Sequence, residues 1–140
     1  MNSDPLMLDT HCWVWMQFGI TSQFSLEGRA ALDRAADENR LLLSVISVWE
    51  VAVLESKRRL ELWMDCAAWV ERALRTPGLT LAPLTPEIAI QSTRLPGVLH
   101  GDPADRLIVA TARAHGAMLM TKDRKLLAYG RAKHVRVISA

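Results

Sequence analysis

The chain has 140 residues, of which half are hydrophobic and 23% are charged, and its net charge is +2 with a pI near 8.8. This length suggests a single domain over residues 1–140, and the balance of residue types is typical of a globular chain. No apolar run reaches the roughly 20 residues that span a bilayer, and no basic region precedes an apolar stretch at the N-terminus. We therefore expect no membrane segment and no secretory signal. Cys12 and Cys66 are far apart, which favours a cytoplasmic chain with two free thiols.

The first half of the chain predicts two strands and three helices from its apolar periodicity. In chain order these are a strand at residues 6–8, a helix at 10–18, a helix from Ser25 to about Asn39, a strand at 41–45 and a helix from Ser47 to about Arg59. Ser25 and Ser47 are typical N-cap residues. Glu50 lies three residues after Ser47, so these two residues also match a capping box.

The second half predicts four helices and three strands, again in alternation. In chain order these are a helix from Asp65 to about Thr76, a strand at 79–82, a helix starting at 85–87, a helix from Asp102 to about His115, a strand at 117–121, a short helix at 124–129 and a strand at 135–138. Pro86 and Pro103 occupy first helical positions, where proline is favoured. Gly78 and Gly116 mark helix ends.

This alternation predicts an α/β fold with a central, mostly parallel five-stranded sheet covered on both faces. The predicted strands are continuously apolar rather than alternating, which is typical of strands buried on both sides. In such sheets ligands bind at the carboxyl ends of the strands, near the point where the strand order reverses. Candidate functional residues are therefore sought just after the strands.

Four acids occupy such positions: Asp9, Glu50, Asp105 and Asp123. Asp9 and Asp123 directly follow predicted strands, and Glu50 and Asp105 lie in first turns of helices, where each also has an ordinary structural role as a cap or dipole partner. If these four carboxylates gather at one rim of the sheet, they repel one another. The pKa of at least one of them is then raised unless a cation is present. Mg²⁺ and Mn²⁺ prefer oxygen ligands. The natural reaction of such a site is metal-assisted attack of water on a phosphodiester.

Four blocks of the chain, in this order, resemble the signatures of the PIN-domain family, and among its members the VapC-type toxins of bacterial toxin–antitoxin pairs. The blocks are residues 8–13 (LDTHCW), 47–52 (SVWEVA), 100–110 (HGDPADRLIVA) and 121–123 (TKD). The resemblance covers residues 6 to 138. It implies a three-layer α/β/α sandwich, cleavage of RNA as an endoribonuclease with Mg²⁺ or Mn²⁺, inhibition by a cognate antitoxin protein, and a homodimer.

The resemblance maps the four acids onto the acidic quartet of the family, and we propose their individual roles as hypotheses. Asp9 and Asp105 become direct metal ligands, Asp123 ligates directly or through water, and Glu50 positions the attacking water or holds a second metal. Asp102 is an additional acid that we interpret mainly as a helix cap. The hydroxyl groups of Thr10 and Thr121 are candidates for orienting the carboxylates, and Arg106 for contacting an RNA phosphate or pairing with an acid. Arg58 departs from the family pattern, because relatives often carry glycine there.

Other functions fit less well. A haloacid-dehalogenase-like phosphatase needs a second acid two residues after Asp9, where this chain has His11. A receiver domain needs an acid pair near the end of the first strand and an Asp closing the third strand, and neither is present. Two alternatives stay open: a solitary PIN-domain nuclease of RNA processing, and a PIN domain that only binds RNA or protein.

Basic and aromatic residues suggest how partners bind. Basic clusters occur at residues 57–59, 124–125 and 131–136; such runs are usually solvated faces, and they are also typical of phosphate binding. The four histidines have no zinc-site spacing, so we interpret them as surface or helix-end residues. Five tryptophans are either core residues or part of an apolar groove for a partner helix. They are Trp13, Trp15, Trp49, Trp63 and Trp69.

Overall fold

The computed structural model describes residues 4–99 and 101–140 of the chain. Its centre is a five-stranded sheet in which each neighbouring pair is parallel, with the order β3-β2-β1-β4-β5. The strands are β1 (Leu6–Leu8), β2 (Leu41–Ser44), β3 (Leu79–Ala82), β4 (Met118–Thr121) and β5 (Val137–Ser139). The predicted parallel five-stranded sheet is confirmed. His100, which begins one of the four sequence blocks, lies outside the described residues.

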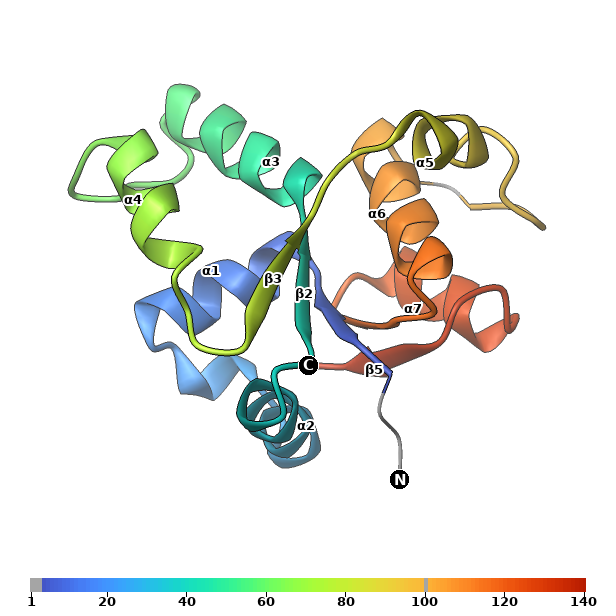
Figure 1. Cartoon of the computed structure of the whole chain (residues 1–140), viewed down its shortest axis with the longest axis horizontal. Helices are drawn as coiled ribbons and strands as arrows, with labels where there is room; N and C mark the ends of the chain where they lie inside the picture. The colour runs from blue at the N-terminus through green and yellow to red at the C-terminus, as the bar shows by residue number, and fades with distance from the viewer. Residues whose placement is uncertain (1–3, 100) are drawn as a thin grey trace.

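Helices cover both faces of this sheet and make the predicted three-layer sandwich (Figure 1). They are α1 (Thr10–Phe18), α2 (Leu26–Asp37), α3 (Val45–Ser56), α4 (Cys66–Ala73), α5 (Pro86–Gln91), α6 (Pro103–Ala114) and α7 (Arg124–Arg131). A short 3-10 helix at Thr21–Gln23, which sequence reasoning did not predict, lies between α1 and α2. Helices α1 to α4 lie on one side of the sheet and α5 to α7 on the other.

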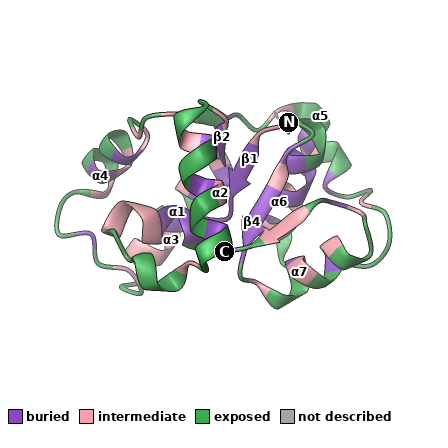
Figure 2. Cartoon of the chain, turned by 90° about the horizontal axis from the view of Figure 1, so that it is seen from below, coloured by how far each residue is buried: buried purple, intermediate pink, exposed green. Residues whose placement is uncertain are grey.

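Alternate side chains of each strand enter two separate cores. Leu6 and Leu8 of β1 pack with residues of α1, α2, α3 and α4, whereas Met7 packs with residues of α6 and α7. Figure 2 shows strands β1 and β4 buried between the helical layers and the outer side of α2 exposed. Because both faces are covered, the ends of the strands are the places where polar side chains can gather.

The tryptophans divide between core and surface. Trp13 is fully buried and meets the buried Trp69 in a T-shaped contact with ring centroids 5.2 Å apart. Trp49 and Trp63 are exposed by 57% and 80%. The core interpretation therefore holds for Trp13 and Trp69, and Trp49 and Trp63 are surface residues.

The start of α3 corrects one prediction. The N-cap is Ser44, whose hydroxyl accepts from the amide of Ile46 at 3.1 Å, and not Ser47. Ser47 lies inside the helix and is fully buried, so it does not form a capping box with Glu50. Strand β2 passes into α3 without a loop, and Ser44, the last residue of the strand, is also the cap.

Within residues 4–99 and 101–140, no helix has both the length and the apolar character needed to cross a membrane.

Candidate active site

The candidate site lies where the order of the sheet reverses. Strand β1 pairs with β2 on one side and with β4 on the other, so the chain leaves β1 toward one half of the sheet and later returns to the other half. Leu8 is in register with Met120, and the amide of Asp9 donates to the Met120 carbonyl at 2.9 Å. The residues that follow β1 and β4 are therefore neighbours, although more than 100 positions separate them in the sequence.

Asp9 is a buried carboxylate at this junction. It caps α1, with Oδ1 accepting from the Thr10 amide at 2.8 Å, and Oδ2 accepts a 2.6 Å hydrogen bond from the Thr121 hydroxyl. Burial raises the pKa of Asp9, and the hydrogen bonds from Thr121 and Thr10 oppose this only in part. The charge of Asp123 raises the pKa further, whereas His11 lowers it. Asp9 therefore caps α1, and burial disfavours its ionised form.

Asp123 is connected to the site by a hydrogen bond to Thr121. The Thr121 hydroxyl accepts from the Asp123 amide at 2.9 Å while it donates to Asp9. Asp123 Oδ1 accepts from the amides of Lys125 and Leu126 at 2.8 and 3.2 Å, which makes Asp123 the N-cap of α7. The two acids predicted after strands are therefore connected by one buried threonine.

Glu50 reaches the site from the second turn of α3. Its Oε1 accepts from the Thr10 hydroxyl at 2.5 Å, and the same hydroxyl is hydrogen-bonded to the Ser47 hydroxyl at 2.8 Å. Burial raises the pKa of Glu50, and the nearby Asp9 and Asp102 raise it further, against the hydrogen bond from Thr10. Ser47 therefore supports Thr10 and Glu50 from inside the helix.

Asp105 is the residue on which the acidic charges converge. It lies in the first turn of α6, where its amide donates to Oδ1 of the N-cap residue Asp102 at 2.8 Å. Its pKa rises from 3.8 to about 7, first because of burial and then because of four like charges. In order of effect these charges are Asp102, Asp9, Asp123 and Glu50. All four predicted acids therefore influence one another at one end of the sheet.

Within the described ranges 4–99 and 101–140, none of the salt bridges involves these four acids. The salt bridges found there join Arg40 to Glu38, Arg75 to Glu71 and Arg136 to Asp4. In the same residues, no three His, Cys, Asp or Glu side chains form a group that could hold a metal ion as they stand. The site is thus a set of mutually repelling carboxylates whose oxygens are not drawn together around a common point.

His11 and Ser47 interact with the site more closely than the sequence suggested. His11, interpreted as a surface residue, is exposed, and its charge lowers the pKa of both Asp9 and Glu50. Ser47, interpreted as a cap, is buried against Thr10. The sequence signal for His11 was its place directly after Asp9-Thr10 in the first block. Among the residues that the structure describes, Arg106 forms no salt bridge, and its guanidinium donates to the Leu99 carbonyl at 3.0 Å.

Comparison with known proteins identifies the family. The PIN domain family profile matches residues 6–132. Ribonuclease VapC22 of Mycobacterium tuberculosis is 33% identical to this chain over an alignment of 135 residues, and the match covers 94% of this chain and 97% of that protein. Two solved structures share the fold. VapBC2 from Rickettsia felis bound to a promoter DNA fragment has a TM-score of 0.67 and 19% identity, over 96% of this chain and 97% of its own. DNA-bound VapBC from Salmonella typhimurium has a TM-score of 0.68 and 18% identity, over 97% and 98%. The chain belongs to the PIN-domain family.

Proposed function

We propose that this chain is a Mg²⁺- or Mn²⁺-dependent endoribonuclease and the toxin of a toxin–antitoxin pair. The observation that carries the proposal is the hydrogen-bonded arrangement of acids after β1 and β4, in which Thr121 joins Asp9 to Asp123 and Thr10 joins Asp9 to Glu50. The raised pKa of Asp105 supports it, because Asp9, Glu50 and Asp123 all contribute to that rise. The proposal is also supported by the family, since this PIN-domain chain is 33% identical to a ribonuclease. Repulsion among unpaired carboxylates is the condition that a divalent cation relieves.

The residues present fit such a cation by their chemistry. Carboxylate oxygens are the donors that Mg²⁺ and Mn²⁺ prefer, and Asp9, Asp105 and Asp123 would hold the ion, with Glu50 at its edge. When bound, the ion supplies an activated water and neutralises charge on the phosphate. Because no three of these side chains yet form an ion-sized group, we expect the carboxylates to move closer when the ion binds.

The chain's own residues hold the carboxylates in place for this reaction. Thr121 orients Asp9, and Thr10, backed by Ser47, orients Glu50. A raised pKa makes Glu50 a stronger base than an ordinary glutamate, which suits it to hold the attacking water and accept its proton. Ser47 and the two threonines are positioning residues, because none of them carries the charge that the reaction needs.

Site variants test the nuclease directly. We expect Asp9→Asn and Asp105→Asn to lower RNA cleavage in Mn²⁺ by at least about a hundredfold, and calorimetry to show weaker Mn²⁺ binding by Asp105→Asn. Asp33→Asn, at an exposed position of α2, is the matched control and should cleave at the native rate. Cleavage at the native rate by Asp9→Asn would remove Asp9 from the mechanism.

The partner proposal has its own support and test. Two structures that share the fold are VapBC complexes bound to DNA. The exposed Trp63 lies beside Phe18, with ring centroids 5.9 Å apart, and both residues line a cavity of about 420 Å³. Co-expression with the small protein encoded by the neighbouring reading frame should give a complex that does not cleave RNA. Light scattering on the free chain should give the mass of a homodimer. A free monomer would argue against the homodimer, and cleavage unaffected by the co-expressed protein would favour a solitary RNA-processing nuclease.

A further inference from the structure

A second concave site lies along α7, beside the candidate active site but separate from its acids. It is a cavity of about 380 Å³, within the range of roughly 300–1,000 Å³ that is typical of small-ligand sites. It is lined by Val98 of the loop before α6, by Arg124, Lys125, Ala128 and Tyr129 of α7, and by Ala132 and His134 after this helix. Helix α7 is capped by Asp123, so one end of this cavity adjoins the candidate nuclease site.

The walls of the cavity are fixed by contacts on both sides of Val98. The Tyr129 hydroxyl donates to the Pro96 carbonyl at 2.5 Å, and Arg106 donates to the carbonyl of the buried Leu99 at 3.0 Å. Between these two anchors Val98 is 73% exposed. Because the loop is held by hydrogen bonds on both sides of Val98, the apolar surface of this exposed side chain is a fixed feature of the fold.

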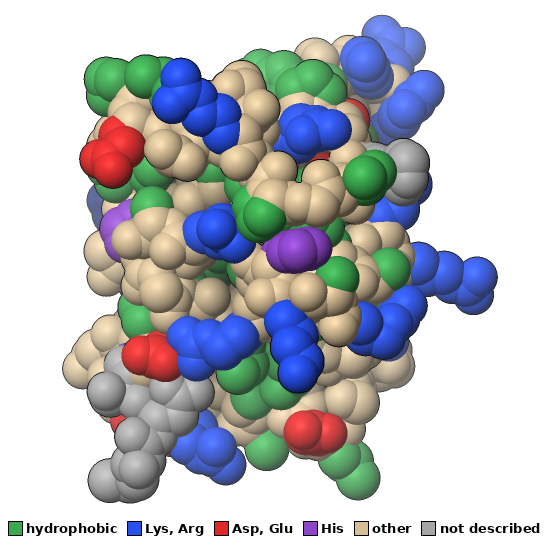
Figure 3. Space-filling model, turned by 90° about the vertical axis from the view of Figure 1, so that its right-hand side faces the viewer, with side chains coloured by type: hydrophobic (Ala, Val, Ile, Leu, Met, Phe, Trp, Pro, Cys, Tyr) green, Lys and Arg blue, Asp and Glu red, His purple; other side chains and the backbone are tan. Residues whose placement is uncertain are grey.

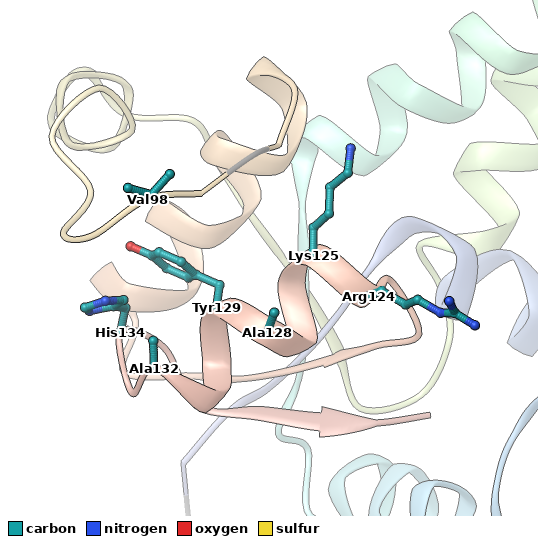
Figure 4. A pocket seen from close by; sticks show the side chains of 7 residues that line it. All are labelled: Val98, Arg124, Lys125, Ala128, Tyr129, Ala132 and His134. Atoms are coloured by element: carbon teal, nitrogen blue, oxygen red, sulfur yellow. The ribbon is translucent and has the colours of Figure 1, made fainter.

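The His134 ring forms a fixed aromatic wall. It lies against the Tyr129 ring, with centroids 4.9 Å apart and the planes tilted by 41°. The ring atom nearest to Gly97 is Nε2, and a Cβ at Gly97 would lie 2.4 Å from it. Gly97 also has a φ of +68°, so glycine is favoured where the loop approaches the ring. Figure 4 shows Val98 and His134 beside the Tyr129 ring, and Lys125 and Arg124 extending in different directions from the other end of α7.

The surface around the cavity is basic. Figure 3 shows that Lys and Arg side chains are spread over this face of the molecule and that acidic side chains are few. The described residues that contribute charge near α7 include Lys125, Arg131, Lys133 and Arg113, whose guanidinium donates to the His134 carbonyl. Such a combination of an apolar and aromatic hollow with cations around it matches a single-stranded nucleic acid, in which flat bases alternate with phosphates.

We infer that this cavity binds one unpaired base of the RNA strand, next to the nucleotides at the cleavage site, while Lys125 contacts a neighbouring phosphate. The inference rests on the proposed function and specifies where its substrate binds outside the acids. Helix α7 has eight residues and is about 12 Å long, which corresponds to a few nucleotides at about 3.4 Å each. A strand whose scissile phosphate lies at Asp123 therefore reaches the cavity within a few nucleotides.

Two variants at one exposed alanine test the site without removing a contact that the fold uses. Ala128→Glu places a carboxylate in the cavity and Ala128→Leu fills it, while Ala67→Glu makes the same charge change on α4, on the other side of the sheet. Binding of a fluorescein-labelled, unstructured single-stranded RNA of mixed sequence is measured by anisotropy in EDTA, so that no cleavage occurs. We expect Ala128→Glu to bind about tenfold more weakly and Ala128→Leu several-fold more weakly, with Ala67→Glu at the native affinity.

A second measurement separates base binding from charge. On a strand with a mapped cleavage position, single abasic sites are introduced one by one on both sides. In the native protein one abasic position near the cleavage site should weaken binding about tenfold, and in Ala128→Leu the same position should have no further effect. A flat abasic profile, or the same profile in both proteins, overturns the inference.

The outcomes also distinguish this inference from the proposed function. If the native chain cleaves RNA and Ala128→Glu binds RNA as tightly as the native chain does, the cavity inference alone is wrong. If Ala128→Glu keeps RNA affinity but loses a co-expressed antitoxin, the cavity is a protein-docking surface and the inference is again wrong. If the native chain and Asp9→Asn both fail to cleave RNA in Mn²⁺, the proposed function fails, whatever the anisotropy shows.

Discussion

The Thr121 hydroxyl donates to Asp9 Oδ2 at 2.6 Å and so joins two residues that are 112 positions apart in the sequence. Both groups are buried, and Thr121 also accepts from the Asp123 amide. One hydroxyl thereby sets the orientation of one acid and the backbone of another.

Replacing Thr121 by valine should weaken Mn²⁺ binding by about tenfold and destabilise the fold by about 1–3 kcal/mol. The reason is that Asp9 loses a hydrogen bond that lowers its pKa, and a buried carboxylate oxygen is left without that donor. Calorimetry with Mn²⁺ and urea unfolding measure the two effects. Thr121→Ser keeps the hydroxyl and is the control; a serine variant as defective as valine would mean that the methyl group, not the hydrogen bond, matters.

Asp105 predicts an unusual pH dependence of stability in EDTA. Its pKa is about 7 in the folded chain and near 3.8 in the unfolded one, so the folded state binds the extra proton between these values. The free energy of unfolding should therefore fall as the pH rises from about 4 to about 7, because the ionised carboxylate is unfavourable among like charges. Asp105→Asn removes this cost and should raise the stability at pH 8 by about 1–3 kcal/mol, with little change at pH 4.

Thermal unfolding at the two pH values measures this difference, and Mn²⁺ provides the control. At pH 8 the ion should raise the melting temperature of the native chain and have a smaller effect on Asp105→Asn. An asparagine variant that is less stable than the native chain at pH 8 in EDTA would mean that Asp105 is not repelled by its neighbours.

The start of α3 gives a prediction about stability alone. Ser44→Ala removes the N-cap hydroxyl and should cost about 1 kcal/mol, a typical value for the loss of a helix cap. Ser47→Ala should instead change the pH profile of cleavage, since Ser47 supports the Thr10–Glu50 contact. Urea unfolding and a pH–rate profile distinguish the two. A pH profile altered by Ser44→Ala and not by Ser47→Ala would contradict the assigned roles.

Trp63 should matter for a partner and not for the fold. Because its side chain is 80% exposed, Trp63→Ala should leave the free energy of unfolding within about 0.5 kcal/mol of the native value. The same variant should weaken retention of a co-expressed antitoxin by about tenfold or more, since exposed tryptophan is enriched at binding hot spots. The matched comparison is Leu26→Ala, at a 92% exposed position of α2 away from the cavity beside Phe18. Equal retention of the antitoxin by all three proteins would exclude this surface.

The sequence predicted the five strands and the seven longer helices, and it predicted which acids follow the strands. Asp9 and Asp123 could be placed at strand ends because apolar runs directly precede them, and parallel strands end at the same edge. The prediction of Ser47 as the cap of α3 was wrong, because Ser44 is an equally good N-cap residue and no loop separates strand from helix. The bond from Thr121 to Asp9 depends on the order of the strands, which no local pattern specifies. The same holds for the contact of Gly97 with His134.

The strand order also determines when the protein can become active. Strand β1 is made first, but its neighbour β4 and the residues Thr121 and Asp123 come near the end of the chain. A nascent or truncated product that stops before residue 118 lacks one side of the sheet around Asp9 and two of the contacts described above. Under the proposed function, a product that stops before residue 118 is not a nuclease, so the activity arises only when most of the chain has been synthesised.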